Sequence, residues 1–469
     1  MNSKLNKNGY IIKKSDITPK ELKQIKDELF VKPFTFNKNQ NKDSGFQVYM
    51  ESPKKLYIPR YYGLKKFGIP KVNKMEEGDK INIKFKGELR NEQVPIEELY
   101  LKNAKEKGGG IISIKCGGGK TVLALHIASI LSVKTIVVVH KDFLMTQWRD
   151  RIMEFLPNAR IGKIQQNTID IEDKDIILAM VQSLSMKEYN EGIFDSFGLA
   201  IFDECHHLGA EVFFKSMRKV SSKYMLGLSA TPKRKDGLSK VFEWFIGDIV
   251  FNQIKKNEDY AEVQLIDCNF TEEEYCKEEL NFRKEPCMPK MINNICNYLP
   301  RTKMIIEETI KYNKLGRNVL ILSDRRGHLE CMYNLLKDYS RGYYVGGMKP
   351  DELRESQEKD ILLATFSMAA EGMDIPKLDT VILASPKSDV EQSVGRVFRK
   401  KACDREFHPL IIDLQDNFSM FEKQCGKRLA LYRKLNFTIF HNGEELKKRT
   451  RKKKDKVVIK DFSLFDEES

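Results

Sequence analysis

A short stretch around residue 118 constrains the fold most strongly. The apolar run Gly110–Ile114 is predicted to be a buried strand, and the apolar residues that follow Thr121 have helical spacing. Four small residues form the turn between them: Cys116, Gly117, Gly118 and Gly119. Such a turn aims backbone N–H groups and a helix N-terminus at one point, and this arrangement binds phosphate. Because Lys120 and Thr121 follow the glycines directly, a nucleotide site is favoured over a plain glycine turn before a core helix.

A pair of carboxylates is expected beside this turn. Asp203 and Glu204 end an apolar run, and the carboxyl ends of parallel strands meet at one edge of a sheet. We expect Lys120 to reach the β- and γ-phosphates. The Thr121 hydroxyl and, through water, Asp203 would hold Mg²⁺. Glu204 would orient or deprotonate the attacking water.

Strand-like and helix-like runs alternate twice along the chain, which predicts an α/β fold with two parallel sheets. The first series is expected to contain the strands Gly110–Ile114, Thr135–Val139, Asp175–Ala179, Leu199–Asp203 and Tyr224–Ser229. The second is expected to contain Asn318–Ser323, Asp360–Thr365, Thr380–Leu383 and, as its last strand, Pro409–Leu414. A helix is expected over Asp389–Arg399.

Five segments follow from this pattern. We expect a small N-terminal accessory region over residues 1–85, the first α/β domain over 86–253 and the second over 301–445. The charged, cysteine-bearing stretch 254–300 is predicted to be a linker, and 446–469 a basic, disordered tail. The tail is either a tether for phosphates or a merely solvated charge run.

Charge and cysteine content limit the class of protein. A net charge of +14 and a pI of about 9.1 favour a polyanionic partner, although a lysine-rich surface also serves solubility. Nine cysteines, no C-x-x-C and no secretory pattern favour reduced thiols in an intracellular compartment. Four of the cysteines are too widely and irregularly spaced to favour a metal site: Cys268, Cys276, Cys287 and Cys296. No apolar run approaches the ~18 residues of a membrane span, so we expect no membrane partner.

Three further patterns each leave two interpretations open. Arg396 and Arg399 lie one helical turn apart, so they are either an arginine-finger pair or part of a basic surface helix. The segment Ser229-Ala230-Thr231 either senses nucleotide state through Asp203 or is an ordinary strand exit into a proline turn. The aromatic and basic segment Tyr57–Tyr62 either stacks bases or packs as an accessory strand.

As an ordered set, these motifs resemble those of superfamily 2 helicases. The set comprises the glycine turn ending in Gly-Lys-Thr, Asp-Glu-Cys-His at residue 203, Ser-Ala-Thr at 229, and Gln392-Ser-Val-Gly-Arg-Val-Phe-Arg. The resemblance implies that Gln93 contacts adenine, and that segments 137–148 and 179–184 meet the nucleic-acid backbone. It also implies that segment 364–376, with Gly372 and Asp374, couples strand contact to ATP. Gln392 belongs by the same resemblance to the catalytic set.

Details of the motifs resemble one part of this superfamily more than others. The Asp-Glu-Cys-His box, and Ser393 where RNA helicases of the Asp-Glu-Ala-Asp type have arginine, resemble XPB-like DNA translocases. Phe242–Gly247 and Tyr343–Gly347 resemble the poxvirus and giant-virus transcript-release helicases.

The resemblance implies two tandem RecA-like domains that bind ATP with Mg²⁺ and use hydrolysis to move along nucleic acid. It implies DNA as the favoured track with RNA as the second option, 3′ to 5′ polarity, a monomer, and a setting in viral transcription with an RNA polymerase as partner. The location would then be the host cytoplasm or the virion, and the nucleus if the chain is not viral. Two alternatives are a nucleic-acid-binding scaffold with a silent ATPase and the motor subunit of a restriction-type system. The complete catalytic set disfavours the first, and the lack of a nuclease motif disfavours the second.

Overall fold

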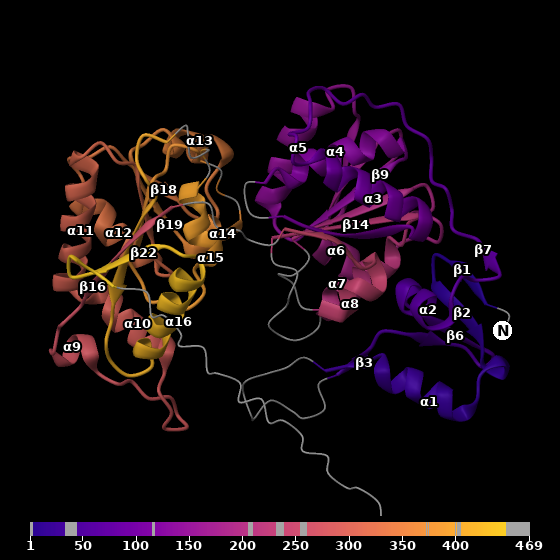
Figure 1. Ribbon diagram of the computed structural model, residues 1–469, viewed down its shortest axis with the longest axis horizontal. Coiled ribbons are helices and arrows are strands. Elements are labelled where there is room, and N and C mark those ends of the chain that lie inside the picture. The colour runs from indigo at the N-terminus through magenta and orange to yellow at the C-terminus, as the bar shows by residue number, and fades with distance from the viewer. Residues whose placement is uncertain are drawn as a thin grey trace, which may run out of the picture. The chain divides into compact units, whose positions relative to one another are not determined.

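The structure is a computed structural model of the chain, with two compact units, residues 1–256 and 257–469 (Figure 1). It describes residues 3–32, 45–114, 118–204, 210–230, 239–253, 260–371, 373, 375–398, 400 and 405–446. None of the helices within these ranges is long and apolar enough to cross a membrane.

The N-terminal accessory region is a small sheet covered by two helices. The sheet has the order β5-β6-β2-β1-β7. Its strands are β1 (Lys4–Asn6), β2 (Gly9–Lys13), β5 (Met50–Glu51), β6 (Lys55–Ile58) and β7 (Val72–Asn73). The helices are α1 (Pro19–Glu28) and α2 (Arg60–Phe67), and β3 (Phe30–Val31) pairs with β4 (Phe46–Gln47). Because buried and exposed residues alternate along β2 and β6, Tyr10, Ile12 and Leu56 form one apolar face.

The segment Tyr57–Tyr62 packs, so the stacking interpretation is wrong. Arg60 is 8% exposed, and its guanidinium donates to the carbonyl oxygens of Lys223 at 2.8 Å and Lys107 at 3.0 Å. Tyr61 is buried, and the Tyr62 ring contacts the edge of Trp244 at 5.6 Å between centroids. These contacts fix the accessory region to the rest of the first unit.

The first large sheet has the order β11-β10-β12-β9-β13-β14-β8-β15 and is parallel except for the β10–β11 pair. Its first four strands along the chain are β8 (Gly109–Ser113), β9 (Thr135–Val139), β10 (Ile161–Gln165) and β11 (Thr168–Asp170). The other four are β12 (Ile176–Met180), β13 (Leu199–Asp203), β14 (Tyr224–Ser229) and β15 (Ile249–Asn252). All five predicted strands are present, three of them with the predicted bounds.

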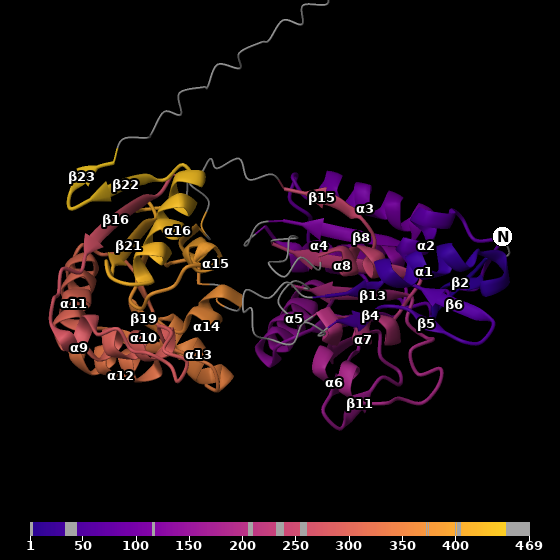
Figure 2. The ribbon, with the colours of Figure 1, turned by 90° about the horizontal axis from the view of Figure 1, so that it is seen from below.

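Helices cover both faces of this sheet (Figures 1 and 2). One face packs against α3 (Val94–Lys107), α4 (Lys120–Leu131) and α5 (Asp142–Phe155). The other packs against α6 (Val181–Met186), α7 (Ala210–Lys219) and α8 (Ser239–Ile246). Along β9, Val137 belongs to the first core, and Ile136 and Val138 to the second. Burial on both faces explains why the central strands are continuous apolar runs.

The second unit contains a sheet of the order β18-β19-β17-β20-β21-β16-β22-β23, parallel except for the last pair. Its strands are β16 (Glu262–Asp267), β17 (Val319–Leu322), β18 (Arg341–Tyr344), β19 (Ile361–Ala364), β20 (Thr380–Leu383), β21 (Leu410–Gln415), β22 (Thr438–His441) and β23 (Glu444–Glu445). Its helices are α9 (Glu273–Cys276), α10 (Met288–Asn297), α11 (Leu299–Lys314), α12 (Arg326–Leu335), α13 (Pro350–Gln357), α14 (Phe366–Glu371), α15 (Glu391–Val394) and α16 (Phe421–Lys434).

Three sequence predictions are wrong in this unit. Residues 254–300 are not a linker throughout, because β16 lies inside the sheet and α10 packs into its core. Only two of the six β16 residues, Val263 and Leu265, are fully buried, and the polar residues between them hid the strand. β21 is not the last strand, since β22 and β23 follow it. The helix predicted over Asp389–Arg399 is only α15, and residues 395–398 continue as a 3₁₀ turn.

Candidate functional site

The glycine turn and the two carboxylates meet at one edge of the first sheet. β8 leads into the turn and β13 ends in Asp203, and both strands run parallel with β14 between them. Gly119 has a φ of +75° and precedes the first residue of α4. A Cβ atom there would lie 2.5 Å from the Gln93 side-chain nitrogen. Both the left-handed backbone and the close contact therefore require glycine at this position.

An ion pair joins the turn to the carboxylates. The Lys120 ammonium contacts a carboxylate oxygen of Glu204, and the two side chains are 12% and 14% exposed. Glu204 has a φ of +46°, a backbone conformation that costs free energy in a residue with a side chain. Such strain persists where the surroundings hold it, and it is typical of functional sites. The structure therefore brings together two residues that the sequence predicts to act on the same phosphate.

Asp203 is buried and held by an indole. It is 7% exposed, and the Trp148 Nε1–H group donates to its Oδ2 at 2.8 Å. Burial, and then the neighbouring charge of Glu204, raise the pKa of Asp203, while Lys120 and the Trp148 hydrogen bond act in the opposite direction. Sequence reasoning placed Trp148 in a backbone-contacting segment and missed this contact. The only signal for it was the rarity of tryptophan, with two in the chain.

Gln93 contacts the phosphate-binding turn. Its side-chain nitrogen donates to the carbonyl oxygens of Gly118 and Gly119, both at 3.1 Å, and its oxygen accepts from the Arg90 N–H at 3.0 Å. It is 2% exposed. The structure thus places Gln93 against the turn itself, and its contact with adenine stays a prediction.

Oxygen donors suitable for Mg²⁺ adjoin both members of the ion pair in the sequence. Thr121 is the second residue of α4 and is partly exposed, and Asp203 ends β13. A hydroxyl and a carboxylate are hard ligands of the kind that Mg²⁺ prefers together with water and phosphate oxygens. These residues fit the cation, but its binding stays a prediction. Cys116 and Gly117 lie outside the described residues.

In the second unit, Arg396 is engaged with backbone carbonyls. It is 4% exposed, and its guanidinium donates to the carbonyl oxygen of Met373 at 2.7 Å and to that of Ala370. Gln392 lies on α15 and is partly exposed. The role of both at a phosphate stays a prediction. Arg399, Gly372 and Asp374 lie outside the described residues.

The cysteines between the predicted domains have buried and partly exposed members. Burial raises the pKa of the Cys268 thiol to about 12 and that of Cys296 to about 11, so both stay protonated and bind metals poorly. Within the described ranges, no three His, Cys, Asp or Glu side chains gather closely enough to hold a metal ion.

Comparisons with known proteins identify two conserved domains in the chain. Residues 86–234 match the family described as "Type III restriction enzyme, res subunit", and residues 301–401 match the "Helicase conserved C-terminal domain". The first match contains the glycine turn, Asp203 and Glu204, and the second contains Gln392, Arg396 and Arg399.

Three viral relatives extend the likeness over the chain. "Putative ATP-dependent RNA helicase L396" of Acanthamoeba polyphaga mimivirus is 35% identical over 98% of this chain and 91% of that protein. "Putative helicase 161L" of Invertebrate iridescent virus 6 is 27% identical over 76% and 83%. "Putative ATP-dependent RNA helicase QP509L" of African swine fever virus is 24% identical over 74% and 73%.

The chain therefore belongs to the superfamily 2 helicases, with two tandem RecA-like domains as its core. It is an ATP-hydrolysing helicase that acts on nucleic acid, and it is related to the helicases of giant viruses and of African swine fever virus. The closer resemblance to XPB-like translocases stays a prediction.

Proposed function

We propose that the chain hydrolyses Mg²⁺-ATP at the glycine turn of its first unit and uses the energy to move along DNA. The observation that carries this proposal is the Lys120–Glu204 ion pair beside buried Asp203, at the N-terminus of α4. A helix N-terminus with a lysine and two carboxylates provides phosphate binding and water activation within one small volume.

Triphosphate competes with Glu204 for Lys120. A phosphate group carries more negative charge than one carboxylate, so it draws the Lys120 ammonium away from Glu204. The released carboxylate then orients the attacking water or takes its proton. Nucleotide binding thereby activates the residue that hydrolysis needs, and Glu204 is occupied by Lys120 when no phosphate is bound.

The Mg²⁺ ion would be held by the Thr121 hydroxyl and, through water, by Asp203. When bound, it neutralises charge on the phosphate oxygens. Asp203 must be ionised for this, although burial raises its pKa. Trp148 and Lys120 both favour the ionised form, so they prepare the carboxylate for the cation.

In the second unit, Arg396 and Arg399 would stabilise charge that develops on the transferred phosphoryl group, with Gln392 assisting on the same segment. Arg396 bonds to the carbonyls of Ala370 and Met373, on either side of Gly372. The arginine segment and segment 364–376 are thus linked by side-chain hydrogen bonds. A nucleic-acid contact that moves segment 364–376 would therefore also move the arginine segment. This supports coupling of ATP turnover to strand contact.

We further propose viral transcription as the setting, with an RNA polymerase as partner, a monomeric enzyme, and the host cytoplasm or virion as its location. The relatives are viral, which supports the setting. The names of two of them specify RNA, so RNA is the second candidate track. ATPase stimulation by single-stranded DNA, duplex DNA and RNA, measured in parallel, separates these tracks.

Two variants test the site. Lys120→Ala and Glu204→Gln should each lower nucleic-acid-stimulated turnover by about 10²–10⁴-fold, because each removes a group that acts on the phosphate or the water. DNA binding without ATP should remain within about twofold of the wild-type affinity, since neither residue is assigned to the strand. Normal hydrolysis by Glu204→Gln would refute its role. Wild-type protein that binds DNA without turnover would instead support the scaffold alternative.

A further inference from the structure

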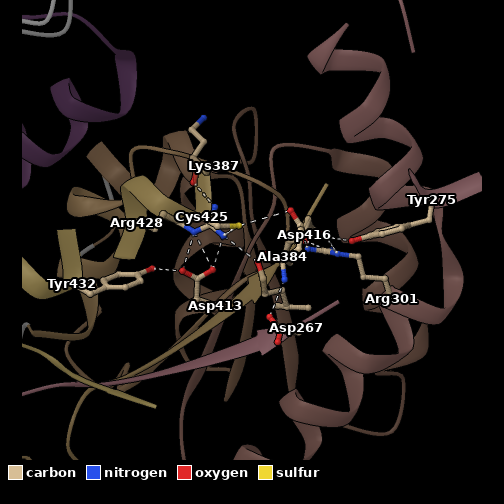
Figure 3. A network of polar contacts seen from close by, with 12 residues as sticks. Asp267, Tyr275, Arg301, Ala384, Lys387, Asp413, Asp416, Cys425, Arg428 and Tyr432 are labelled. Carbon is tan, nitrogen blue, oxygen red and sulfur yellow. Dashed lines mark hydrogen bonds and ion pairs between the residues drawn. The ribbon is translucent and has the colours of Figure 1, made fainter. Parts of the chain in front are cut away.

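We propose that two buried arginines of the second unit, Arg301 and Arg428, are positioning residues for ATP hydrolysis. They fix the loop between β20 and α15, residues 384–390, and through it the segment that carries Gln392 and Arg396. This inference rests on the proposed role of that segment in phosphoryl transfer. Figure 3 shows both arginines, with the loop residues Ala384 and Lys387 that they reach.

Arg428 reaches the middle of the loop from α16. Its guanidinium forms a buried ion pair with Asp413 of β21, with an Nη2–Oδ1 distance of 2.8 Å. A second N–H group, on Nη1, donates to the Lys387 carbonyl oxygen at 2.9 Å. The Tyr432 hydroxyl donates to Asp413 at 2.8 Å and so completes the carboxylate's partners. Arg428 is 2% exposed and Asp413 is 0% exposed.

Arg301 reaches the near end of the loop from α11. Its Nε and Nη2 groups donate to the two carboxylate oxygens of Asp416, at 2.7 and 2.9 Å. Its Nη1 group donates to the Ala384 carbonyl oxygen at 2.6 Å. The Tyr275 hydroxyl donates to Asp416 at 2.6 Å. Arg301 is 0% exposed and Asp416 is 1% exposed.

The two ion pairs share a feature that packing alone does not require. Each guanidinium satisfies a buried carboxylate and uses a remaining N–H group on a carbonyl of the same loop, although the arginines come from different helices. A planar guanidinium with five N–H donors can serve both acceptors at once, and an ammonium on a shorter stem cannot. We call the Arg301–Asp416 and Arg428–Asp413 pairs the two clamps. Both contact the loop, one at residue 384 and the other at residue 387.

The segment that follows the loop needs this support. α15 has four residues, and one helical turn has little stability of its own. Further contacts also hold the loop. Among them, the Lys387 ammonium lies 2.6 Å from Asp324 Oδ2, and the Ser385 hydroxyl accepts from the Asp324 N–H at 2.9 Å. Glu391, the first residue of α15, comes four residues after Lys387, so a shift of the loop moves Gln392 and Arg396 with it.

The test is a set of arginine-to-lysine variants of the full chain. Arg301→Lys and Arg428→Lys keep the charge opposite each aspartate but lose the loop carbonyl. Arg317→Lys is the matched control, because Arg317 also pairs with an aspartate, Asp379 at 3.2 Å, and donates to a carbonyl, that of His408 at 3.0 Å. Its partners precede β20 and β21, at the opposite edge of the sheet from the loop.

We expect both clamp variants to lower kcat for ATP by about ten- to a hundredfold, because small displacements of catalytic groups have effects of this size. ATP affinity, measured by direct nucleotide binding, should stay within about twofold, since Lys120 and the glycine turn lie in the other unit. The Arg317→Lys variant should keep the wild-type kcat. All three variants should remain folded at the assay temperature, which thermal unfolding measured in parallel will show.

Arg396→Ala separates failure of this inference from failure of the proposed function. If Arg396→Ala lowers kcat and the clamp variants match Arg317→Lys, the inference is overturned and the proposed function stands. If Arg396→Ala and Arg399→Ala both keep wild-type turnover, the role of the segment fails, and the inference fails with it. Should the clamp variants unfold, Lys387→Met removes the partly exposed pair with Asp324 instead. A severalfold loss of kcat would then support the inference, and wild-type kcat would overturn it.

Discussion

In the first unit the catalytic side chains come from the end of one strand, β13, and the start of one helix, α4. In the second unit, the segment with Gln392 and Arg396 follows a loop whose position depends on residues 301, 413, 416 and 428. The first site is built from neighbouring elements of the sheet and is assembled once the sheet forms. The second depends on two buried ion pairs, Arg428–Asp413 and Arg301–Asp416. Changes at the first should therefore affect chemistry, and changes at the second should affect stability and chemistry together.

The largest stability effect is expected in the second unit. Asp413→Ala leaves the Arg428 guanidinium buried without its carboxylate, so the free energy of unfolding should fall by about 3–5 kcal/mol. The matched change, Asp379→Ala, removes the partner of Arg317 in a pair whose side chains are each 14% exposed, so it should cost less than Asp413→Ala. Denaturant titrations of both variants measure the difference. Equal losses would show that burial of the Arg428–Asp413 pair does not increase its contribution to the free energy of unfolding.

A smaller effect, also in the second unit, depends on pH. Burial lowers the pKa of His328 to about 3, from 6.5. The unfolded chain therefore binds a proton below pH 6.5 that the folded chain does not, so stability contributed by neutral His328 is lost as the pH falls from 6.5 toward 3. We expect a loss of up to about 1.4 kcal/mol per pH unit in this window.

The His328 prediction is measured as a difference between two proteins. Unfolding free energies of the wild type and of His328→Gln, taken at pH 7 and pH 5, remove the contribution of other titrating groups. The wild type should lose more stability than the variant between these two pH values. Identical pH dependence would show that His328 takes up its proton equally in both states.

The smallest of these effects is expected in the first unit and concerns activity. Trp148→Phe removes the indole hydrogen bond that lowers the pKa of Asp203, so that pKa should rise further. Hydrolysis needs ionised Asp203, so the acid limb of the kcat profile should move to higher pH. A pH–rate profile of wild type and variant measures this shift. If the acid limb lies at the same pH in both proteins, ionisation of Asp203 does not control the pH dependence of kcat.

The sequence predicted the strands of the first unit better than those of the second for physical reasons. Strands such as Thr135–Val139 and Leu199–Asp203 are buried on both faces, so they are continuous apolar runs with clear ends. The glycine turn and Asp203-Glu204 are local in sequence, and local patterns are readable. β16 is half polar and was therefore mistaken for linker.

Contacts between residues that are far apart in the chain could not be predicted from the sequence. Trp148 and Asp203 are 55 residues apart, and Arg301 and Asp416 are 115 apart. No periodicity links such pairs, and the second pair joins a residue of α11 to the residue that follows β21. The engagement of Arg396 with backbone carbonyls was missed for the same reason, because a pattern of spacing does not show which acceptors a side chain reaches.

ATP-driven displacement of a labelled strand from partly duplex DNA tests the central claim most directly. Wild-type protein should displace the strand only when Mg²⁺-ATP is present. Glu204→Gln should bind the same DNA and displace nothing, because it retains phosphate binding through Lys120 but cannot activate water. Displacement by Glu204→Gln at the wild-type rate, or by wild type without ATP, would contradict an account in which hydrolysis at this ion pair drives movement.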